Sequence, residues 1–249
     1  MNAYLNHLEK IEFVLTDACT GACKHCSQGD HKKRGSCLDA ELAAKAVADI
    51  TSFYPIKTVM VFGGEPLLFP EVTARIMQAA KEARIPHRQI ITNGYFAKDP
   101  TRMETVAKLL AESGVNDLLL SVDAFHQETI PLETVRRFAL FAKEAGIPLR
   151  LQPAWLVHPE SENPYNRITR SILNELKRDA FPESAGNIIF PEGNAKKYLA
   201  QYFTDKLPEN PYVEDPKNLR CLSVDADGSL LGQSLYEKSV LEIIRDYRA

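Results

Sequence analysis

Three cysteines near the start of the chain have the spacing of an iron–sulfur ligand set. Cys19, Cys23 and Cys26 form a Cys-x3-Cys-x2-Cys motif directly after the apolar run 11–16. Clusters that only transfer electrons usually take four cysteines, and structural zinc usually takes four Cys or His ligands. Three thiolates that leave the end of one strand can ligate three irons of a cubic four-iron cluster, and the fourth iron is then free to bind a substrate or cofactor. The motif therefore favours chemistry over scaffolding.

A zinc knuckle is the alternative interpretation of the same cysteines. His25 and His31 stand close enough in the sequence for one of them to complete a four-ligand zinc site. Such a site would leave the later polar motifs of the chain without a role, so the cluster interpretation is preferred.

Further polar or glycine-rich groups follow later apolar runs. They are Gly63-Gly64-Glu65-Pro66, Thr92-Asn93-Gly94, Ser121 with Asp123, Phe125-His126-Gln127, and Gln152. Parallel α/β folds bind ligands at the carboxyl ends of their strands. Because each group stands at the end of a predicted strand, we expect all of them on one rim of the fold.

The predicted elements alternate between strand and helix over most of the chain. Apolar, β-branched runs predict strands at 11–16, 58–62, 88–92, 117–122, 149–156 and 187–190. Helical spacing of apolar residues predicts helices at 39–53, 71–83, 102–113, 133–145 and 167–180. This order indicates an α/β fold with a parallel sheet and right-handed crossovers. The pattern alone leaves open whether the sheet is flat or curls into a partial barrel.

Composition excludes several classes of function. The chain has 249 residues, a net charge of −3 and a single basic run, 32–34, which we interpret as a solvated loop; no nucleic-acid partner is expected. No apolar run approaches the roughly 20 residues that cross a bilayer, so no membrane partner is expected. Residues 1–10 lack the core of a signal peptide. Five cysteines, an odd number with three clustered, suit a reducing compartment, so a cytoplasmic location is predicted.

The last quarter of the chain differs from the rest. We expect one domain over 1–195 and a linker with a small appendage over 196–249, because 198–218 is rich in proline and polar residues. The segments 222–225 and 229–233 flank an Ala-Asp-Gly turn and predict a hairpin. A short helix is predicted over 239–247.

Over about 11–190 the chain resembles the radical S-adenosylmethionine (radical SAM) superfamily. The resemblance is carried by three motifs, which follow one another along the chain: the cysteine motif, Gly63-Gly64-Glu65-Pro66 and Ser121-Val122-Asp123. The resemblance implies a partial (β/α)6 TIM-like barrel that holds a [4Fe–4S] cluster. It also implies that the free iron chelates S-adenosylmethionine through its amino and carboxylate groups. Reductive cleavage then yields methionine and a 5′-deoxyadenosyl radical, which abstracts a hydrogen atom from an organic substrate.

The resemblance also implies roles for individual residues. Cys19, Cys23 and Cys26 would be the iron ligands, and His25 would lie beside the adenine, with plain surface exposure as its alternative. Gly63 and Gly64 would let the backbone approach the cofactor, and Glu65 would accept from the cofactor ammonium; an ordinary turn is the alternative for all three.

Four further residues are candidates for the cofactor site. Ser121 and Asp123 match positions that bind the ribose hydroxyls, while Asp123 could instead cap a turn. Asn93 is either a cofactor-binding residue or part of a left-handed Asn-Gly turn. Gln152 is expected to reach the cofactor or the substrate.

His126 is the candidate catalytic residue. It stands on the predicted active rim, where it could act as a general base or contact the substrate. A structural histidine bonded to a loop is the alternative.

The tail departs from a pattern found in many peptide-modifying members. Cys221 followed by Gly228 resembles the start of the appended SPASM/twitch-like domain, but Gln233 stands where a further cysteine is needed. We therefore expect a degenerate appendage without an auxiliary cluster, which leaves Cys37 and Cys221 unassigned; a buried hydrophobic role for Cys221 is favoured.

The sequence predicts an enzyme but not its substrate. The tail favours peptide or protein modification, although the few residues before the first strand predict that a peptide would need a separate partner or capture by the tail. The alternatives are a small-metabolite enzyme, a glycyl-radical activase and a non-catalytic iron–sulfur or zinc protein. A flavodoxin- or ferredoxin-like electron donor is the expected partner.

Overall fold

The computed structural model describes residues 2–31, 35–203 and 209–249, so the basic run 32–34 lies outside the described residues. Its centre is a six-stranded sheet in the order β5-β4-β3-β2-β1-β8, and every neighbouring pair is parallel. The strands are β1 (Lys10–Val14), β2 (Thr58–Phe62), β3 (His87–Thr92), β4 (Asp117–Ser121), β5 (Leu149–Gln152) and β8 (Cys221–Val224).

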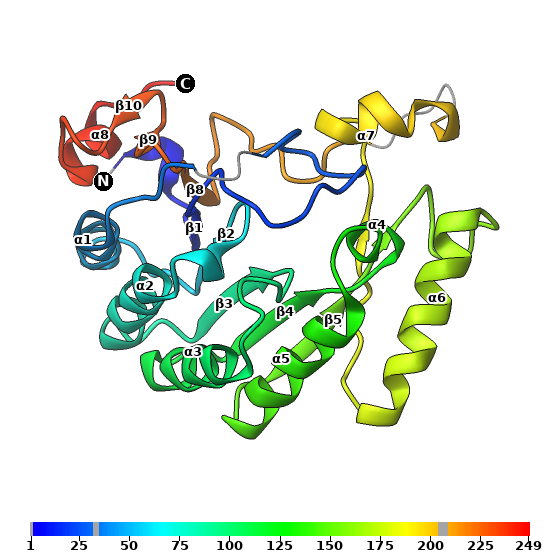
Figure 1. The fold of residues 1–249 in the computed structure, drawn as a ribbon. Helices are drawn as coiled ribbons and strands as arrows, with labels where there is room; N and C mark the ends of the chain where they lie inside the picture. Colours follow the sequence, from blue (N-terminus) through cyan, green and yellow to red (C-terminus); the bar gives the residue numbers. More distant parts are fainter. Residues whose placement is uncertain (1, 32–34, 204–208) are drawn as a thin grey trace.

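Helices cover the outer, convex side of this curved sheet (Figure 1). They are α1 (Ala40–Thr51), α2 (Pro70–Glu82), α3 (Pro100–Ser113), α5 (Leu132–Glu144) and α6 (Pro164–Leu176). Each presents an apolar stripe to the sheet; in α1 the buried residues are Ala43, Ala44, Ala46, Val47 and Ile50. The α/β prediction with alternating strands and helices is confirmed.

The first strand shows how the sheet separates its core from its inner face. Ile11 and Phe13 are fully buried beneath the helices, whereas Lys10 and Glu12 point the other way. Successive side chains of a strand face opposite sides, so a strand with this pattern packs a core on one side only. The inner side is therefore free to line a site.

The predicted strand 149–156 is interrupted. Pro153 separates β5 from the short β6 (Ala154–Trp155), because proline has no N–H with which to continue a ladder. β6 pairs in parallel with β7 (Asn187–Ile188), which is the sixth predicted strand. The segment before β7 pairs in parallel with β5 through Glu183 and Leu151, so the chain extends the sheet beyond β5, consistent with a partial TIM-like barrel.

The predicted hairpin between 222–225 and 229–233 is wrong. β8 instead pairs in parallel with β1, with Leu222 opposite Ile11, and extends the main sheet at its other edge. The tight turn does form, since the Asp225 N–H donates to the Ser229 carbonyl (3.0 Å). The antiparallel hairpin lies one step later, between β9 (Ser229–Leu230) and β10 (Gln233–Ser234). The apolar residues of 222–225 are better buried in a large sheet than in an isolated hairpin.

Helix ends follow local capping chemistry. α6 begins earlier than predicted because Asn163 caps it and Pro164 occupies its first turn. The terminal helix α8 (Val240–Asp246) has the capping box of Ser239 and Glu242, which confirms the predicted helix. Two short helices were not predicted, α4 (Ala124–Gln127) and α7 (Gly193–Tyr198). No helix in the described part of the chain has the length and apolar content needed to cross a bilayer.

Candidate active site

A cavity of about 570 Å³ opens on the inner side of the sheet. The last residues of four neighbouring strands, Phe62, Thr92, Ser121 and Gln152, all line it. Every predicted site residue except Glu65 lines it as well. The expectation that the chemical groups share one rim is therefore met by the geometry.

The cysteine-bearing loop is held against the glycine turn that follows β2. Gly64 N donates to the Thr16 carbonyl (2.8 Å), and Glu65 N donates to the Ala18 carbonyl (2.8 Å). A Cβ on Gly64 would overlap the Ala18 carbonyl, and Gly63 has a φ of +130°. The two glycines border the cavity, but the close approach that requires them is to the cysteine loop.

Glu65 lies beneath the cavity and is fully buried. Its carboxylate accepts from Thr92 Oγ1 (2.7 Å) and from the N–H groups of Asn93 (2.8 Å) and Leu67 (2.9 Å). Burial raises the pKa of this carboxyl to about 7, against the opposing effect of these donors. The structure thus gives Glu65 a positioning role between the ends of β2 and β3, and the predicted contact with a cofactor ammonium is left untested.

Asn93 has both of its expected properties. Its Oδ1 accepts from Tyr95 N (2.8 Å), which forms the turn after β3. Its Nδ2 points to the cysteine loop, 3.2 Å from Thr20 Oγ1 and 3.6 Å from Cys19 Sγ. The side chain therefore links the third strand to the first cysteine while it lines the cavity.

Asp123 caps α4 and holds His126. Its Oδ1 accepts from the N–H groups of Phe125 (2.9 Å) and His126 (3.0 Å), and its Oδ2 accepts from Ala154 N (3.1 Å). The same Oδ2 lies 2.8 Å from His126 Nδ1. Burial alone would raise the pKa of the Asp123 carboxyl, but His126 and the backbone donors hold it at about 2. Asp123 therefore caps a turn, which was the alternative interpretation of this residue. Its contact with a ribose stays a prediction.

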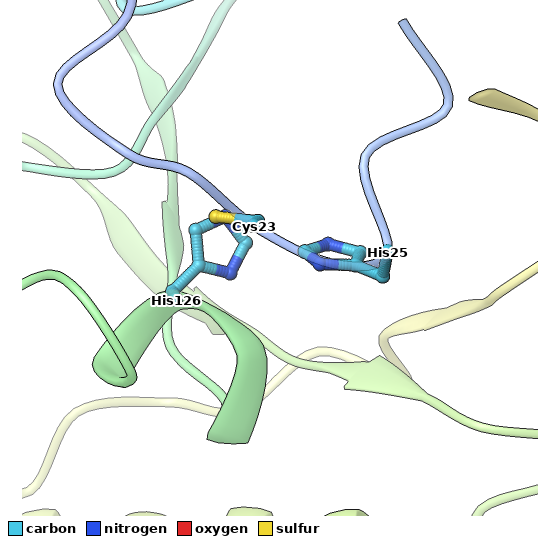
Figure 2. Close-up of side chains that lie close together, drawn as sticks. All are labelled: Cys23, His25 and His126. Carbon is cyan, nitrogen blue, oxygen red and sulfur yellow. The ribbon is translucent and has the colours of Figure 1, made fainter. Parts of the chain in front are cut away.

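His25, His126 and Cys23 meet at the cysteine loop (Figure 2). The His25 ring centre is 4.9 Å from that of His126 and 5.0 Å from that of Phe125. His25 Nδ1 is buried and has no hydrogen-bond partner. Burial lowers the pKa of His25 to about 4, which favours the neutral ring. His25 is thus a cavity-lining aromatic group, as predicted, and its contact with an adenine is untested.

His31 is a neighbour of the third cysteine that the sequence did not assign to the preferred site. Its Nε2 lies 3.1 Å from Cys26 Sγ, and its Nδ1 lies 3.1 Å from the Asp17 carbonyl. The contact with Cys26 raises the pKa of His31. Only its position five residues after Cys26 could have signalled this contact.

Ser121 and Gln152 occupy adjacent strands. They are paired in register at the ends of β4 and β5, and both side chains border the cavity. Gln152 Oε1 accepts a hydrogen bond from Ser184.

The inner end of the cavity is polar, which the sequence analysis missed. Lys10 and Glu12 form an ion pair there, and the Gln89 amide donates to Asp117 (2.6 Å). The sequence carried a signal for this polar surface, because Lys10 and Glu12 alternate with the buried Ile11 and Phe13 along β1.

The donor set fits an iron–sulfur cluster. All five cysteines are free, and the three predicted ligands border the cavity, with Cys23 buried. Burial raises the pKa of the Cys19 thiol to about 11, so its thiolate needs a nearby cation such as cluster iron. The three sulfurs do not form a close group of the kind that could share one ion, as far as the described residues go. Three cysteine ligands are one short of the four that a structural zinc site usually takes, and they leave one iron of a four-iron cluster open.

A family model described as the Radical SAM superfamily matches residues 13–172. Curated relatives include the "Probable GTP 3′,8-cyclase" of Methanocaldococcus jannaschii, 24% identical over 121 residues, or 49% of this chain and 38% of that protein. The "GTP 3′,8-cyclase" of Syntrophomonas wolfei is 28% identical over 148 residues, or 58% of this chain and 43% of that protein. The chain thus spans about two fifths of the length of these relatives.

Solved structures that share the fold include BtrN and HydG. BtrN in complex with AdoMet and 2-DOIA superposes with a TM-score of 0.54 at 16% identity, over 97% of this chain and 84% of that chain. HydG, a maturase of the [FeFe]-hydrogenase, gives a TM-score of 0.52 at 16% identity, over 86% of this chain and 48% of that chain. Because the family model covers more than half of its length and its cysteine loop fits the cluster, this chain belongs to the radical SAM superfamily, whose enzymes use a [4Fe–4S] cluster with S-adenosylmethionine.

Proposed function

We propose that this radical SAM enzyme abstracts a hydrogen atom from a small, polar organic molecule bound inside the partial barrel. The observation that carries the proposal is the cavity itself. It runs from the cysteine loop to the inner faces of β1 and β3, where Lys10, Glu12 and Gln89 offer charged and amide groups. Residues Asn210 and Tyr212 border the same space. The predicted cofactor residues line the same cavity of about 570 Å³, so the space beside the cofactor suits a small ligand held by these polar groups.

A nucleoside triphosphate is a less suitable occupant. The cyclase relatives carry GTP in their printed name, and a triphosphate is bound by several Lys or Arg side chains. Among the described residues that line the cavity there is one lysine, Lys10, and no arginine. That lysine is already paired with Glu12. The charge balance supports a polar substrate of low net charge.

His126 is proposed as the residue that contacts the substrate or moves its proton. The bond from Nδ1 to Asp123 leaves Nε2 as the atom free to face a ligand, and the side chain keeps 15% of its surface exposed. A buried carboxylate that orients an imidazole in this way is a recurring base arrangement. The cofactor, when bound, supplies the radical that abstracts hydrogen; His126 is proposed to manage protons on the substrate.

The leaning towards peptides has no support from the relatives or from the cavity, so a peptide substrate becomes an outcome of the test. The enzyme needs an electron donor and a substrate, as radical SAM enzymes do. A flavodoxin- or ferredoxin-like donor stays a proposal, and so does a cytoplasmic location, which is based on cysteine usage.

The test measures 5′-deoxyadenosine from reconstituted, anaerobically reduced protein. The protein is incubated with S-adenosylmethionine and either the small-molecule or the peptide fraction of a cell extract. We expect the small-molecule fraction to raise 5′-deoxyadenosine formation several-fold and to lose one of its components in parallel. Stimulation by the peptide fraction alone would overturn the proposal.

His126→Ala supplies the matched variant for this assay. We expect its substrate-dependent turnover to fall at least tenfold, because a positioned base contributes about 10² to 10⁴ in rate. His158→Ala is the control, since His158 lies outside the residues that line the cavity. Equal turnover of both variants would remove His126 from the reaction.

A further inference from the structure

Cys23, His25 and His126 form a compact group of three metal-ligating side chains. One ligand atom from each lies within 4.8 Å of the other two. Figure 2 shows Cys23 and His25 on the cysteine loop and His126 facing them from α4. The predicted iron ligands Cys19 and Cys26 are not part of this group.

Two features prepare the imidazoles for a metal ion. Asp123 Oδ2 lies 2.8 Å from His126 Nδ1, which leaves Nε2 as the lone-pair donor. A carboxylate bonded to the far nitrogen of a ligating histidine is the usual support of a zinc site. His25 Nδ1 is buried without a hydrogen-bond partner, so a cation beside it would satisfy a polar atom that otherwise has none.

We propose that Cys23, His25 and His126 form a mononuclear site for a divalent cation of the zinc class, and that this site competes with the [4Fe–4S] cluster for Cys23. One nitrogen of each histidine and the thiolate of Cys23 would be the three protein ligands. The fourth position would hold water, as in zinc sites that have three protein ligands.

The geometry is close to that of such a site. Metal–ligand bonds of about 2.0 to 2.3 Å place tetrahedral ligands roughly 3.5 Å apart. The three ligand atoms now lie within 4.8 Å of one another, so they would have to approach by about 1 Å. Small rotations of two side chains on a loop and a short helix provide that change. Binding releases the thiol proton of Cys23, and the charge of the cation stabilises the thiolate in this buried place.

The zinc ion and the cluster are expected to exclude each other, because both would need the sulfur of Cys23. Cys23 is predicted to ligate one cluster iron, and the same lone pairs are not available to two separate centres. Protein that has taken up zinc is therefore expected to resist cluster assembly until the zinc is removed. This inference goes beyond the proposed substrate chemistry and does not depend on it.

The test titrates metal-free full-length protein with Co²⁺, a spectroscopic substitute for Zn²⁺, in the absence of iron. We expect one equivalent to bind, with thiolate-to-cobalt absorption in the near ultraviolet and visible bands of a tetrahedral ion. Zn²⁺ should displace the cobalt and bleach these bands. Prior loading with one equivalent of Zn²⁺ should lower the iron taken up on reconstitution several-fold, and a chelator should restore it.

Variants separate this site from the cluster site. We expect His25→Ala and His126→Ala to weaken Co²⁺ binding at least tenfold and to leave iron uptake near the wild-type value. Cys19→Ala should do the opposite, since Cys19 belongs to the cluster motif and lies outside the trio. Cys23→Ala should abolish both. Circular dichroism of each variant checks the fold.

Two results would overturn the inference. If Cys19→Ala weakens Co²⁺ binding as much as His126→Ala does, the ion is held by the cysteine motif and not by the trio. If cobalt binds without thiolate absorption, Cys23 is not a ligand. Neither result concerns the substrate, so the proposed function would stand or fall separately.

Discussion

At the scale of single residues, the predicted polar set divides into side chains that face the cavity and side chains that hold others in place. Ser121, Gln152 and His126 border the cavity. Glu65 and Asp123 are fully buried, and their carboxylates accept hydrogen bonds from the ends of neighbouring strands and from α4. Asp123 belongs to both groups, because it also borders the cavity. The residue types were predictable from sequence, but these partners come from different strands and become visible only once the sheet is assembled.

The buried Glu65 carboxyl predicts a dependence of stability on pH. Its pKa is about 7 in the folded protein, which is above the ordinary value, because burial disfavours the charged form. Its contribution to stability is therefore complete below about pH 4.3, the unfolded pKa, and is lost as the pH rises through 7. Relative to Glu65→Gln, we expect the free energy of unfolding of the wild type to fall by up to about 4 kcal/mol over that range.

Urea unfolding of the metal-free protein, followed by circular dichroism at several pH values, measures this difference. Glu82→Gln is the control, because Glu82 lies at the exposed end of α2 and should leave the pH profile unchanged. A difference between wild type and Glu65→Gln that stays constant with pH would show that the carboxyl keeps its ordinary pKa.

At the scale of elements, the short helix α7 fastens the cysteine loop from above the barrel. The backbone N–H of Asn194 donates to the Cys26 carbonyl (2.8 Å), and its side-chain amide donates to the Cys23 carbonyl (3.2 Å). Ala195 and Leu199 are fully buried in the small apolar cluster that also contains Cys23. An element from residue 193 onward therefore positions ligands near residue 20.

Gly193 is the contact point that allows this approach. Its φ is +49°, and a Cβ there would overlap the carbonyls of Cys26 and Ser27. We expect Gly193→Ala to push α7 away from the loop and to lower the iron bound after reconstitution at least twofold. Iron analysis and the visible absorption of the cluster measure the loss.

A second glycine separates backbone strain from collision. Gly146 has a φ of +80°, and a Cβ there would meet nothing within 4 Å. Gly146→Ala should thus cost stability to a similar extent while iron content stays at the wild-type value. Equal iron loss in both variants would assign the effect to general destabilisation and not to the contact with the cysteine loop.

The sequence predicted the helices, which have a strong apolar periodicity, better than the strand pairs that join distant parts of the chain. The helices of the outer layer were located to within a few residues, because their apolar stripes and caps are local signals. The partner of 221–224 was not predicted, since the choice between a near neighbour and β1 depends on contacts about 210 residues apart in the chain. α7 was missed because its six residues carry no repeating apolar pattern.

At the scale of the whole molecule, the tail completes the sheet beside the first strand. β8 covers the free edge of β1, and the amide of Asn2 donates to the carbonyls of Ile244 (2.8 Å) and Tyr247 (2.9 Å). Figure 1 shows both ends of the chain on the same side of the molecule, around α8 and β10. The division into a barrel over 1–195 and an appendage over 196–249 stays a proposal, with the addition that one strand of the second part belongs to the main sheet.

This arrangement predicts a single cluster within the part of the chain that the structure describes. Cys221 lies opposite Lys10 at the amino end of β1, whereas the cysteine motif follows its carboxyl end. Five strand residues at about 3.3 Å each separate the two ends by more than 10 Å, so Cys221 is too distant to join the same cluster. Cys37 is paired with Thr16 by a backbone bridge and does not line the cavity.

Reconstituted protein is therefore expected to hold about four irons and four sulfides, and the double variant Cys37→Ala, Cys221→Ala should hold the same number. The reason is that each additional cluster needs thiolates that the tail does not bring together. Iron and sulfide analysis with electron paramagnetic resonance of the reduced protein measures this. A reproducible value near eight irons, reduced to four in the double variant, would show that these two cysteines take part in a second cluster and that the tail binds metal after all.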